Sequence, residues 1–306
     1  MKFMENTKIN FMKFKSFGFG LSSVLAFASI IMLLMGVNLG IDFKGGTAIG
    51  VNFSEDVSIQ EIRSALKSVS VNESVLDLSS EEIKYFGSES DVMIKIKSLD
   101  NEPENFGQLV INHLYNSMTE KVPENKNDFI LSLGSVSPKV GSELSGKAFW
   151  SVISALVLIL FYISVRFEFR FALGAILALV HDVIITLGVF SLTGFEITLS
   201  TVAAFLTIVG YSLNDTIVIL DRIRENMKSS GTVMFESTIN KSINQSLSRT
   251  LITSLTTLFV IIVLLIYGGE VIRPFSFTML IGVIVGTYSS IYIASALLAT
   301  IYQSSK

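Results

Sequence analysis

The sequence has no cysteine, only two histidines and few charged residues. Without cysteine, disulfide frameworks, thiolate metal sites and cysteine nucleophiles are excluded. No Gly-Lys-Ser/Thr phosphate-binding loop occurs, which excludes an ATPase of that kind. Charged residues make up 16% of the 306 residues, whereas hydrophobic residues make up 50%. This balance and a mean hydropathy of +0.60 exclude an ordinary soluble domain.

The charged residues are concentrated in one third of the chain. Residues 40–146 hold 17 of the 26 acidic and 9 of the 23 basic side chains. The remaining sequence is apolar and carries 9 acidic and 14 basic residues. An acidic segment of about 107 residues is large enough to bury a core of its own. The sequence therefore predicts a membrane protein with one water-facing domain.

Six runs are long and apolar enough to cross a bilayer, which takes about 20 residues. We expect membrane spans at residues 18–39, 148–165, 171–191, 198–220, 251–268 and 275–301. The first run follows several lysines and contains Ala26-Phe27-Ala28, as a secretory signal would. Cleavage there would leave an apolar stub at residues 30–35, so we favour an uncleaved first helix.

Basic residues near the span ends predict the orientation, because they are retained on the cytoplasmic side. With the N-terminus inside, 12 of the 14 bases outside residues 40–146 lie on that side, all but Lys147 and Arg273. We therefore expect an inner-membrane protein with both termini in the cytoplasm. The expected parts are an N-terminal tail and first span at 1–39, an extracytoplasmic domain at 40–146, and five spans at 147–306 with a cytoplasmic loop at 221–250.

The acidic domain has the pattern of a small α+β sandwich. The expected elements are a strand at 47–53, a Ser58-capped helix with Ile59, Ile62, Leu66 and Val69 on one face, strands at 75–86 and 91–97, a helix at 104–118 and a strand at 129–137. This βαββαβ order is typical of a ferredoxin-like domain. It offers no metal-ligand cluster, no Ser-His-Asp set and no basic patch for nucleic acid. We therefore expect it to bind polypeptide, and we expect no catalytic residue, cofactor or metal.

Three segments carry a resemblance to a known family. They are Gly40-Ile41-Asp42-Phe43-Lys44-Gly45-Gly46-Thr47 after the first span, His181-Asp182 in the third, and residues 209–226 (VGYSLNDTIVILDRIREN) in the fourth and beyond. In these segments the chain resembles the SecF family of protein-export membrane subunits, whose six spans and single domain match the whole chain. The fourth-span segment is highly specific, and the glycine-rich segment is shared with SecD-like chains. Ser137 departs from the pattern, since relatives usually have glycine before that proline.

The resemblance implies a six-helix half of a resistance-nodulation-division (RND) membrane protein. It also implies a subunit that pairs with a SecD-like partner and uses the proton-motive force to promote late-stage polypeptide export. Further partners implied are the SecYEG translocon, the translocating polypeptide, YajC, YidC and membrane lipid. Such a subunit is not an enzyme.

Asp215 is the first candidate for proton coupling. It lies about six residues from the cytoplasmic end of the fourth span, hence roughly 9 Å inside the membrane. Placing Asp near a helix centre costs about 2.5 to 3.5 kcal/mol, so we expect this carboxyl to be paired, hydrated or protonated. The alternative is a static hydrogen bond with Asn214 or a hydroxyl. The family resemblance favours the proton-coupling interpretation.

Arg249 opens the fifth span and is the expected charge partner of Asp215, although position alone favours a plain interfacial anchor. Thr250, Thr253, Ser254 and Thr257 follow at helical spacing and form one small polar face. We expect this face to meet the fourth span. It would serve either water and proton traffic or packing alone.

His181 and Asp182 lie near the middle of the third span. Adjacent helical residues point about 100° apart, so the two side chains cannot both face one neighbouring helix. Two roles of this pair remain equally open: a purely structural polar contact and a relay that passes protons.

Two competing functions deserve a comparison. A small-molecule or lipid exporter of the same superfamily usually has two large extracytoplasmic domains on a duplicated chain, whereas this chain has one modest domain. A scaffold of a membrane complex would tolerate neutral replacement of Asp215. The sequence favours the protein-export interpretation.

Overall fold

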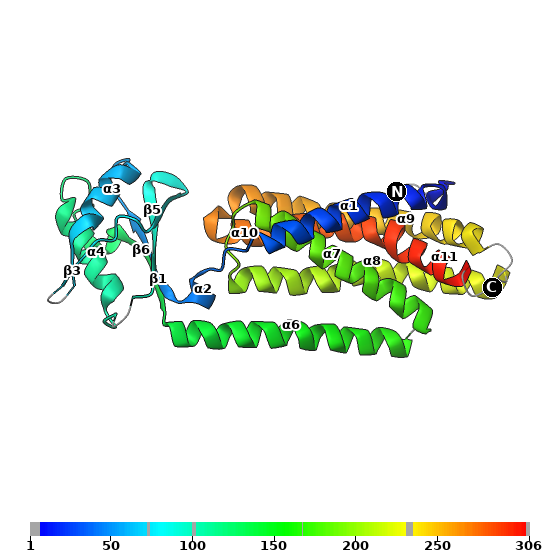
Figure 1. Cartoon of the computed structure of the whole chain (residues 1–306). Coiled ribbons are helices and arrows are strands. Elements are labelled where there is room, and N and C mark those ends of the chain that lie inside the picture. The colour runs from blue at the N-terminus through cyan, green and yellow to red at the C-terminus, as the bar shows by residue number, and fades with distance from the viewer. Residues whose placement is uncertain (1–6, 72–73, 100–101, 167, 231–234, 304–306) are drawn as a thin grey trace. The chain divides into compact units, whose positions relative to one another are not determined.

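The computed structural model describes residues 7–71, 74–99, 102–166, 168–230 and 235–303. It divides into two compact units, one of residues 39–149 and the other of residues 1–38 and 150–306. Figure 1 shows a small mixed unit with a sheet and a unit made of long helices.

The mixed unit has a ferredoxin-like sheet. Its elements are α2 (Ile41–Lys44), β1 (Gly46–Asn52), α3 (Ile59–Ala65), β2 (Val69–Val71), β3 (Ser74–Leu76), β4 (Glu82–Phe86), β5 (Ser88–Lys97), α4 (Phe106–Ser117), α5 (Lys126–Phe129) and β6 (Ile130–Val136). Four strands form an antiparallel sheet in the order β4-β5-β1-β6. This order and the intervening α3 and α4 confirm the expected βαββαβ topology.

The core of this unit lies between the sheet and the helices. Ile94 on β5 faces Ile49 on β1 and Ile83 on β4, and all three are buried. Val110 and Leu114 of α4 pack into the same cluster, which consists of residues of this unit alone. Figure 1 shows α3 and α4 on the same face of the sheet.

The start of α3 confirms the expected cap. Ser58 Oγ accepts a hydrogen bond from Glu61 N at 3.3 Å, and Glu61 Oε2 accepts one from Ser58 N at 2.9 Å. These reciprocal bonds satisfy two amide groups that a helix start leaves unpaired.

Two expectations about this unit were wrong. Val69 is not on the helix face, because a 3₁₀ turn at Leu66–Ser68 ends the helix and Val69 begins β2. Residues 75–86 do not form one strand, since a turn divides them into β3 and β4. A short hairpin of β2 and β3 is therefore added to the expected topology.

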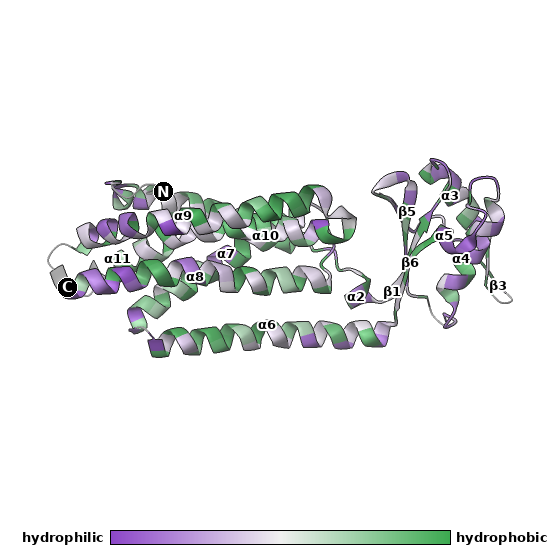
Figure 2. Cartoon of the chain, turned by 180° about the vertical axis from the view of Figure 1, so that it is seen from behind, coloured by the Kyte–Doolittle hydropathy of each residue, from purple (hydrophilic) through white to green (hydrophobic). Residues whose placement is uncertain are grey.

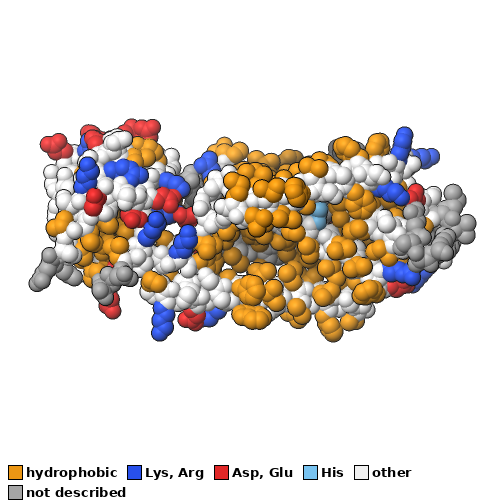
Figure 3. Space-filling view, in the orientation of Figure 1, with side chains coloured by type: hydrophobic (Ala, Val, Ile, Leu, Met, Phe, Trp, Pro, Cys, Tyr) orange, Lys and Arg blue, Asp and Glu red, His pale blue; other side chains and the backbone are white. Residues whose placement is uncertain are grey.

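The helical unit contains six helices long and apolar enough to span a membrane, as counted among the described residues. They are α1 (Lys15–Leu34), α6 (Pro138–Arg166), α7 (Phe169–Leu192), α8 (Leu199–Ser230), α9 (Phe235–Tyr267) and α10 (Gly269–Ser289). A 3₁₀ turn at Phe11–Phe14 precedes α1. Helix α10 continues through a π-helical turn (Ser290–Ala294) into α11 (Ser295–Gln303). Figure 2 shows apolar residues along the middle of these helices. In Figure 3 hydrophobic side chains cover much of the face of the helical unit that is turned to the viewer. The chain is a multi-pass membrane protein of all-α span architecture with one α+β domain.

Helix α10 is the centre of the bundle, because it packs against α7, α8 and α9. Helix α1 packs mainly against α7. Gly188 of α7 faces Ser29 of α1 so closely that a β-carbon would overlap the Ser29 side chain and backbone. Glycine therefore sets the distance between these two helices.

Some helix bounds differ from the expectation. Helix α1 ends at Leu34 and not at residue 39, and Gly36 follows with a φ of 106°. Helix α6 begins ten residues earlier than expected, at Pro138, because proline suits a first helical position. Ser137 caps it, since its Oγ accepts a hydrogen bond from Val140 N at 3.4 Å.

The segment 221–250, expected to be a loop, is helical wherever the structure describes it. Helix α8 continues to Ser230 and α9 begins at Phe235. The two extensions pack on each other, and Asn226 of α8 donates a hydrogen bond to Ser242 Oγ of α9 at 2.8 Å. A buried polar contact of this kind explains why the segment is not a solvated loop.

Candidate functional site

The Asp215 carboxyl group lies inside the bundle on α8 and is 3% exposed. Ser254 Oγ of α9 donates a hydrogen bond to Asp215 Oδ2 at 3.3 Å. The same hydroxyl group lies 2.7 Å from Thr287 Oγ1 of α10. Asp215 therefore sits in a small polar network that joins α8, α9 and α10.

Arg249 lies near this network without a direct ion pair. Its side chain is exposed, yet its charge acts on the Asp215 carboxyl group. Among the described residues no nitrogen of Arg249 lies within 4.0 Å of a carboxylate oxygen of Asp215. Asn214, the other expected neighbour, is exposed and does not join the network.

The hydroxyl groups on the polar face of α9 have three different kinds of surroundings. Thr253 and Thr257 donate their hydroxyl groups to backbone oxygens of their own helix. Thr250 is 1% exposed, and its hydroxyl group has no hydrogen-bond partner among the described residues. Ser254 is the residue of this face whose hydroxyl group reaches neighbouring helices.

A second buried carboxyl group belongs to Asp182 on α7, which is fully buried. Its Oδ2 atom accepts hydrogen bonds from Ser212 Oγ of α8 at 2.5 Å and from Ser289 Oγ of α10 at 2.6 Å. Its Oδ1 atom lies 2.8 Å from His181 Nδ1. Asp182 therefore faces the neighbouring helices, and His181 is its partner on the same helix.

Sequence reasoning missed Ser212, Ser289 and Thr287, the hydroxyl residues that complete both networks. A signal was present for Ser212, which precedes Asp215 by three residues and therefore lies on a similar face of α8. No comparable signal marks Ser289 or Thr287, because hydroxyl residues are frequent along residues 275–301.

The glycine-rich segment 40–47 forms a junction within residues 39–149. Gly45 and Gly46 have φ angles of 78° and 140°, which disfavour side chains. A β-carbon at Gly45 would lie 2.9 Å from the backbone of Pro138, and one at Gly46 would lie 2.5 Å from the Ile96 oxygen. Gly45 therefore allows the chain to approach the start of α6 closely, and Gly46 allows it to approach β5.

The other residues of this segment hold the junction in place. Gly40 precedes α2 as its N-cap, Asp42 lies in the first turn and Phe43 is buried. Thr47 Oγ1 donates to Glu102 Oε1 at 2.8 Å and lies 3.1 Å from Ser135 Oγ. These contacts give the segment a structural role.

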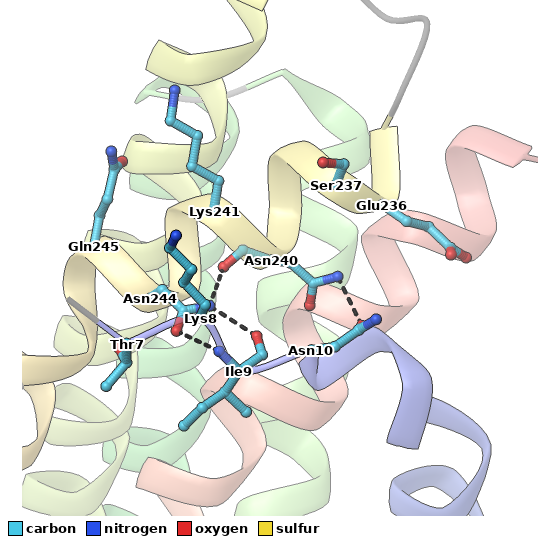
Figure 4. Close-up of a pocket in the computed structure, with 10 residues that line it drawn as sticks. All are labelled: Thr7, Lys8, Ile9, Asn10, Glu236, Ser237, Asn240, Lys241, Asn244 and Gln245. Atoms are coloured by element: carbon cyan, nitrogen blue, oxygen red, sulfur yellow. Dashed lines mark hydrogen bonds between the residues drawn. The ribbon is translucent and has the colours of Figure 1, made fainter.

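A polar pocket of about 530 Å³ lies between the N-terminal segment and the beginning of α9. Figure 4 shows two asparagines of α9 clamping this segment. Asn244 accepts a hydrogen bond from Ile9 N at 3.0 Å and donates one to Ile9 O at 2.8 Å, and Asn240 accepts one from Met12 N at 3.0 Å. The clamp fixes the entry into α1. It brings no cluster of three or more His, Asp or Glu side chains together, and none occurs elsewhere in the described residues.

Comparison with known proteins agrees with this arrangement. Residues 116–304 match the family described as "Protein export membrane protein SecD/SecF, C-terminal", and residues 30–57 match the "SecD/SecF GG Motif". The Protein translocase subunit SecF of Calditerrivibrio nitroreducens is 44% identical over 298 residues, which cover 96% of this chain and 94% of the relative. That of Escherichia coli O157:H7 is 41% identical and covers 94% of this chain and 86% of the relative.

A solved structure shares the fold. The crystal structure of SecDF, a translocon-associated membrane protein from Thermus thermophilus, matches with a TM-score of 0.83 and 36% identity over 98% of this chain. This chain spans 40% of the length of that SecDF chain.

The fold, the two family matches and the structural match place the chain among RND-type membrane proteins of the SecD/SecF class. Within that class, the chain belongs to the SecF family of protein translocase subunits. Its role is therefore in Sec protein export, a transport function.

Proposed function

We propose that this chain, together with a SecD-like partner, uses the proton-motive force to promote late-stage polypeptide translocation across the cytoplasmic membrane. The observation that carries this proposal is the buried Asp215 carboxyl group. It has one hydroxyl donor, Ser254, among the described residues and the charge of Arg249 nearby. A carboxyl group in that position can exist neutral or charged, as a proton-coupled step requires.

The mechanism follows from the contacts of this group. Protonation of Asp215 removes its attraction to Arg249 and changes the bond with Ser254, so α8 and α9 can shift against each other. Both helices also pack against α10, which would spread the movement through the bundle. In this mechanism the chain moves polypeptide and is not an enzyme.

The partners and the orientation belong to the same proposal. The matching SecDF structure supports a SecD-like partner, and that SecDF protein is translocon-associated, which supports association with a translocon. We infer that SecYEG, YajC, YidC and membrane lipid are the further partners. The basic residues support cytoplasmic termini, an extracytoplasmic domain at 40–146, and membrane parts at 1–39 and 147–306.

The test is export into membrane vesicles that contain the complex, with and without a proton gradient. Asp215→Asn removes the titratable group with little change in shape, so it should abolish stimulation by the gradient. ATP-dependent translocation without a gradient should stay unchanged, and Asp215→Glu should keep part of the stimulation. Asp221→Asn, which replaces a half-exposed carboxylate on the same helix, is the matched control and should export normally. Full stimulation in Asp215→Asn would refute the mechanism and favour a scaffold.

A further inference from the structure

One of the hydroxyl groups that contact Asp182 can form either of two alternative hydrogen bonds. Ser289 Oγ has two acceptors within reach, Asp182 Oδ2 at 2.6 Å and Gly286 O at 3.1 Å. A hydroxyl group has one hydrogen to donate, so it can serve only one of them. An ionised Asp182 favours the first acceptor, because bonds to charged groups are stronger. A protonated Asp182 leaves Ser289 free to donate to Gly286.

His181 adds a buried nitrogen atom, Nε2, that can accept a proton. Its Nδ1 atom lies 2.8 Å from Asp182 Oδ1, whereas its Nε2 atom has no hydrogen-bond partner among the described residues. A neutral imidazole that carries its hydrogen on Nδ1 can accept a proton at Nε2. It can then release the Nδ1 proton to Oδ1. One proton enters, one carboxylate is neutralised, and the imidazole ends neutral in its other tautomer.

The surroundings of the pair contain few other titratable groups. Helix α8 contributes Asp215, one turn beyond Ser212, and Tyr211, whose buried hydroxyl group is unpartnered among the described residues. Helix α10 contributes Tyr288, which donates to Gly18 O of α1. The charged residue of α1 is Lys15 at its first position, and it pairs with Glu236. The π-helical turn and α11 have no charged residue within Ser290–Gln303, and their titratable side chains are Tyr292 and Tyr302.

The Asp182 network shares two helices with the Asp215 network. Helix α8 carries both Ser212 and Asp215, and α10 carries both Ser289 and Thr287. Gly286 keeps these helices in contact, since a β-carbon there would lie 3.0 Å from Ser212 Cβ. A change in the bonds to Asp182 therefore acts on the helices that position Asp215.

We propose that His181 and Asp182 form a second proton-binding site, in which the imidazole passes a proton from its Nε2 atom to the Asp182 carboxylate. Loading this site releases Ser289 to Gly286 and loosens α7 from α8 and α10. Only the use of this movement for export rests on the proposed function. Proton binding itself can be measured without export.

The experiment is an infrared titration of the purified complex in lipid nanodiscs, which follows the carbonyl band of protonated carboxyl groups. Part of this band should disappear in Asp182→Asn and remain in Asp215→Asn, whatever the export activity of the latter. Thr186→Val is the matched control, because Thr186 lies one turn further along α7 and its buried hydroxyl group makes no bond among the described residues. It should leave the band unchanged.

Two further variants test the relay without removing the carboxyl group. His181→Gln keeps an amide donor beside Oδ1 but cannot accept a proton, so the Asp182 band should rise about 100-fold more slowly after a downward pH jump. Ser289→Ala removes a hydroxyl donor from the ionised carboxylate, so the midpoint of the band should lie at a higher pH than in the wild type. An unchanged band in Asp182→Asn would overturn the proposal and leave a structural lock. If Asp182→Asn does not fold, wild-type rates in His181→Gln with a wild-type midpoint in Ser289→Ala would overturn it equally.

Discussion

Ser254 Oγ on α9 lies 3.3 Å from Asp215 Oδ2 on α8, and Arg249 lies five residues before Ser254 on the same helix. The carboxyl group thus faces a neutral donor that it contacts and a cation that it does not bind directly. This relationship separates the roles of hydrogen bonding and charge at the proposed coupling site.

Arg249 should act through its charge. Arg249→Lys keeps the charge and should retain much of the gradient-stimulated export, whereas Arg249→Met should lose most of it. Lys241→Met, which removes another exposed base from α9, is the control and should export like the wild type. Export into vesicles with and without a proton gradient measures all three. Equal losses in Arg249→Lys and Arg249→Met would show that charge is not what matters.

Gly188 should be essential for the contact between α1 and α7. Gly188→Ala places a methyl group against Ser29 and should destabilise the helical unit by about 1–3 kcal/mol, because helix backbones must separate. Gly210→Ala is the matched control, since no atom lies within 4 Å of its added β-carbon. Thermal unfolding of the detergent-solubilised complex would compare the two. Similar melting temperatures would contradict the close contact.

The α+β domain should lose stability in acid partly through Glu61. Lys121 and the Ser58 backbone and hydroxyl groups hold the pKa of Glu61 at about 2, well below its ordinary value of 4.5. A lowered pKa means that Glu61 stabilises the fold above pH 4.5 and that this contribution is lost as the pH falls to about 2.

Thermal unfolding of a fragment covering residues 40–137 would test this, because the core of the domain consists of its own residues. The Glu61→Gln fragment should be less stable at neutral pH and should lose less stability on acidification. Glu89→Gln, which replaces an exposed carboxyl group, is the control. A Glu61→Gln fragment with the pH dependence of the wild type would refute this role.

The orientation predicts opposite accessibility of two serines. Ser70 in β2 and Ser237 in α9 are both exposed, and the chain has no native cysteine. Ser70→Cys should react with an impermeant thiol reagent from outside the cell, and Ser237→Cys only after the membrane is opened. Labelling of both from the same side would refute the proposed topology.

Local sequence patterns determined the spans, the βαββαβ order and the cap at Ser58. Each depends on interactions between residues close in sequence: apolar runs fix helices in a membrane, alternation fixes strands, and a hydroxyl group caps the next turn. The glycine-rich motif at residues 40–46 was also recognisable in the sequence, because backbone positions with positive φ angles are usually occupied by glycine. Val69 shows the limit of such patterns, since one residue fits a helix face and a strand equally well.

The tertiary structure alone decided which polar groups meet inside the bundle. Most of the surface of each span is apolar, so the sequence defines only poorly how each helix is rotated about its axis. The prediction for Asp215 therefore named a neighbouring face of α9 but could not single out Ser254. It also could not place Asn214 outside the network or bring Ser212 and Ser289 together on Asp182. Those contacts join residues 30 and 107 positions apart, and only helix packing brings them within hydrogen-bonding distance.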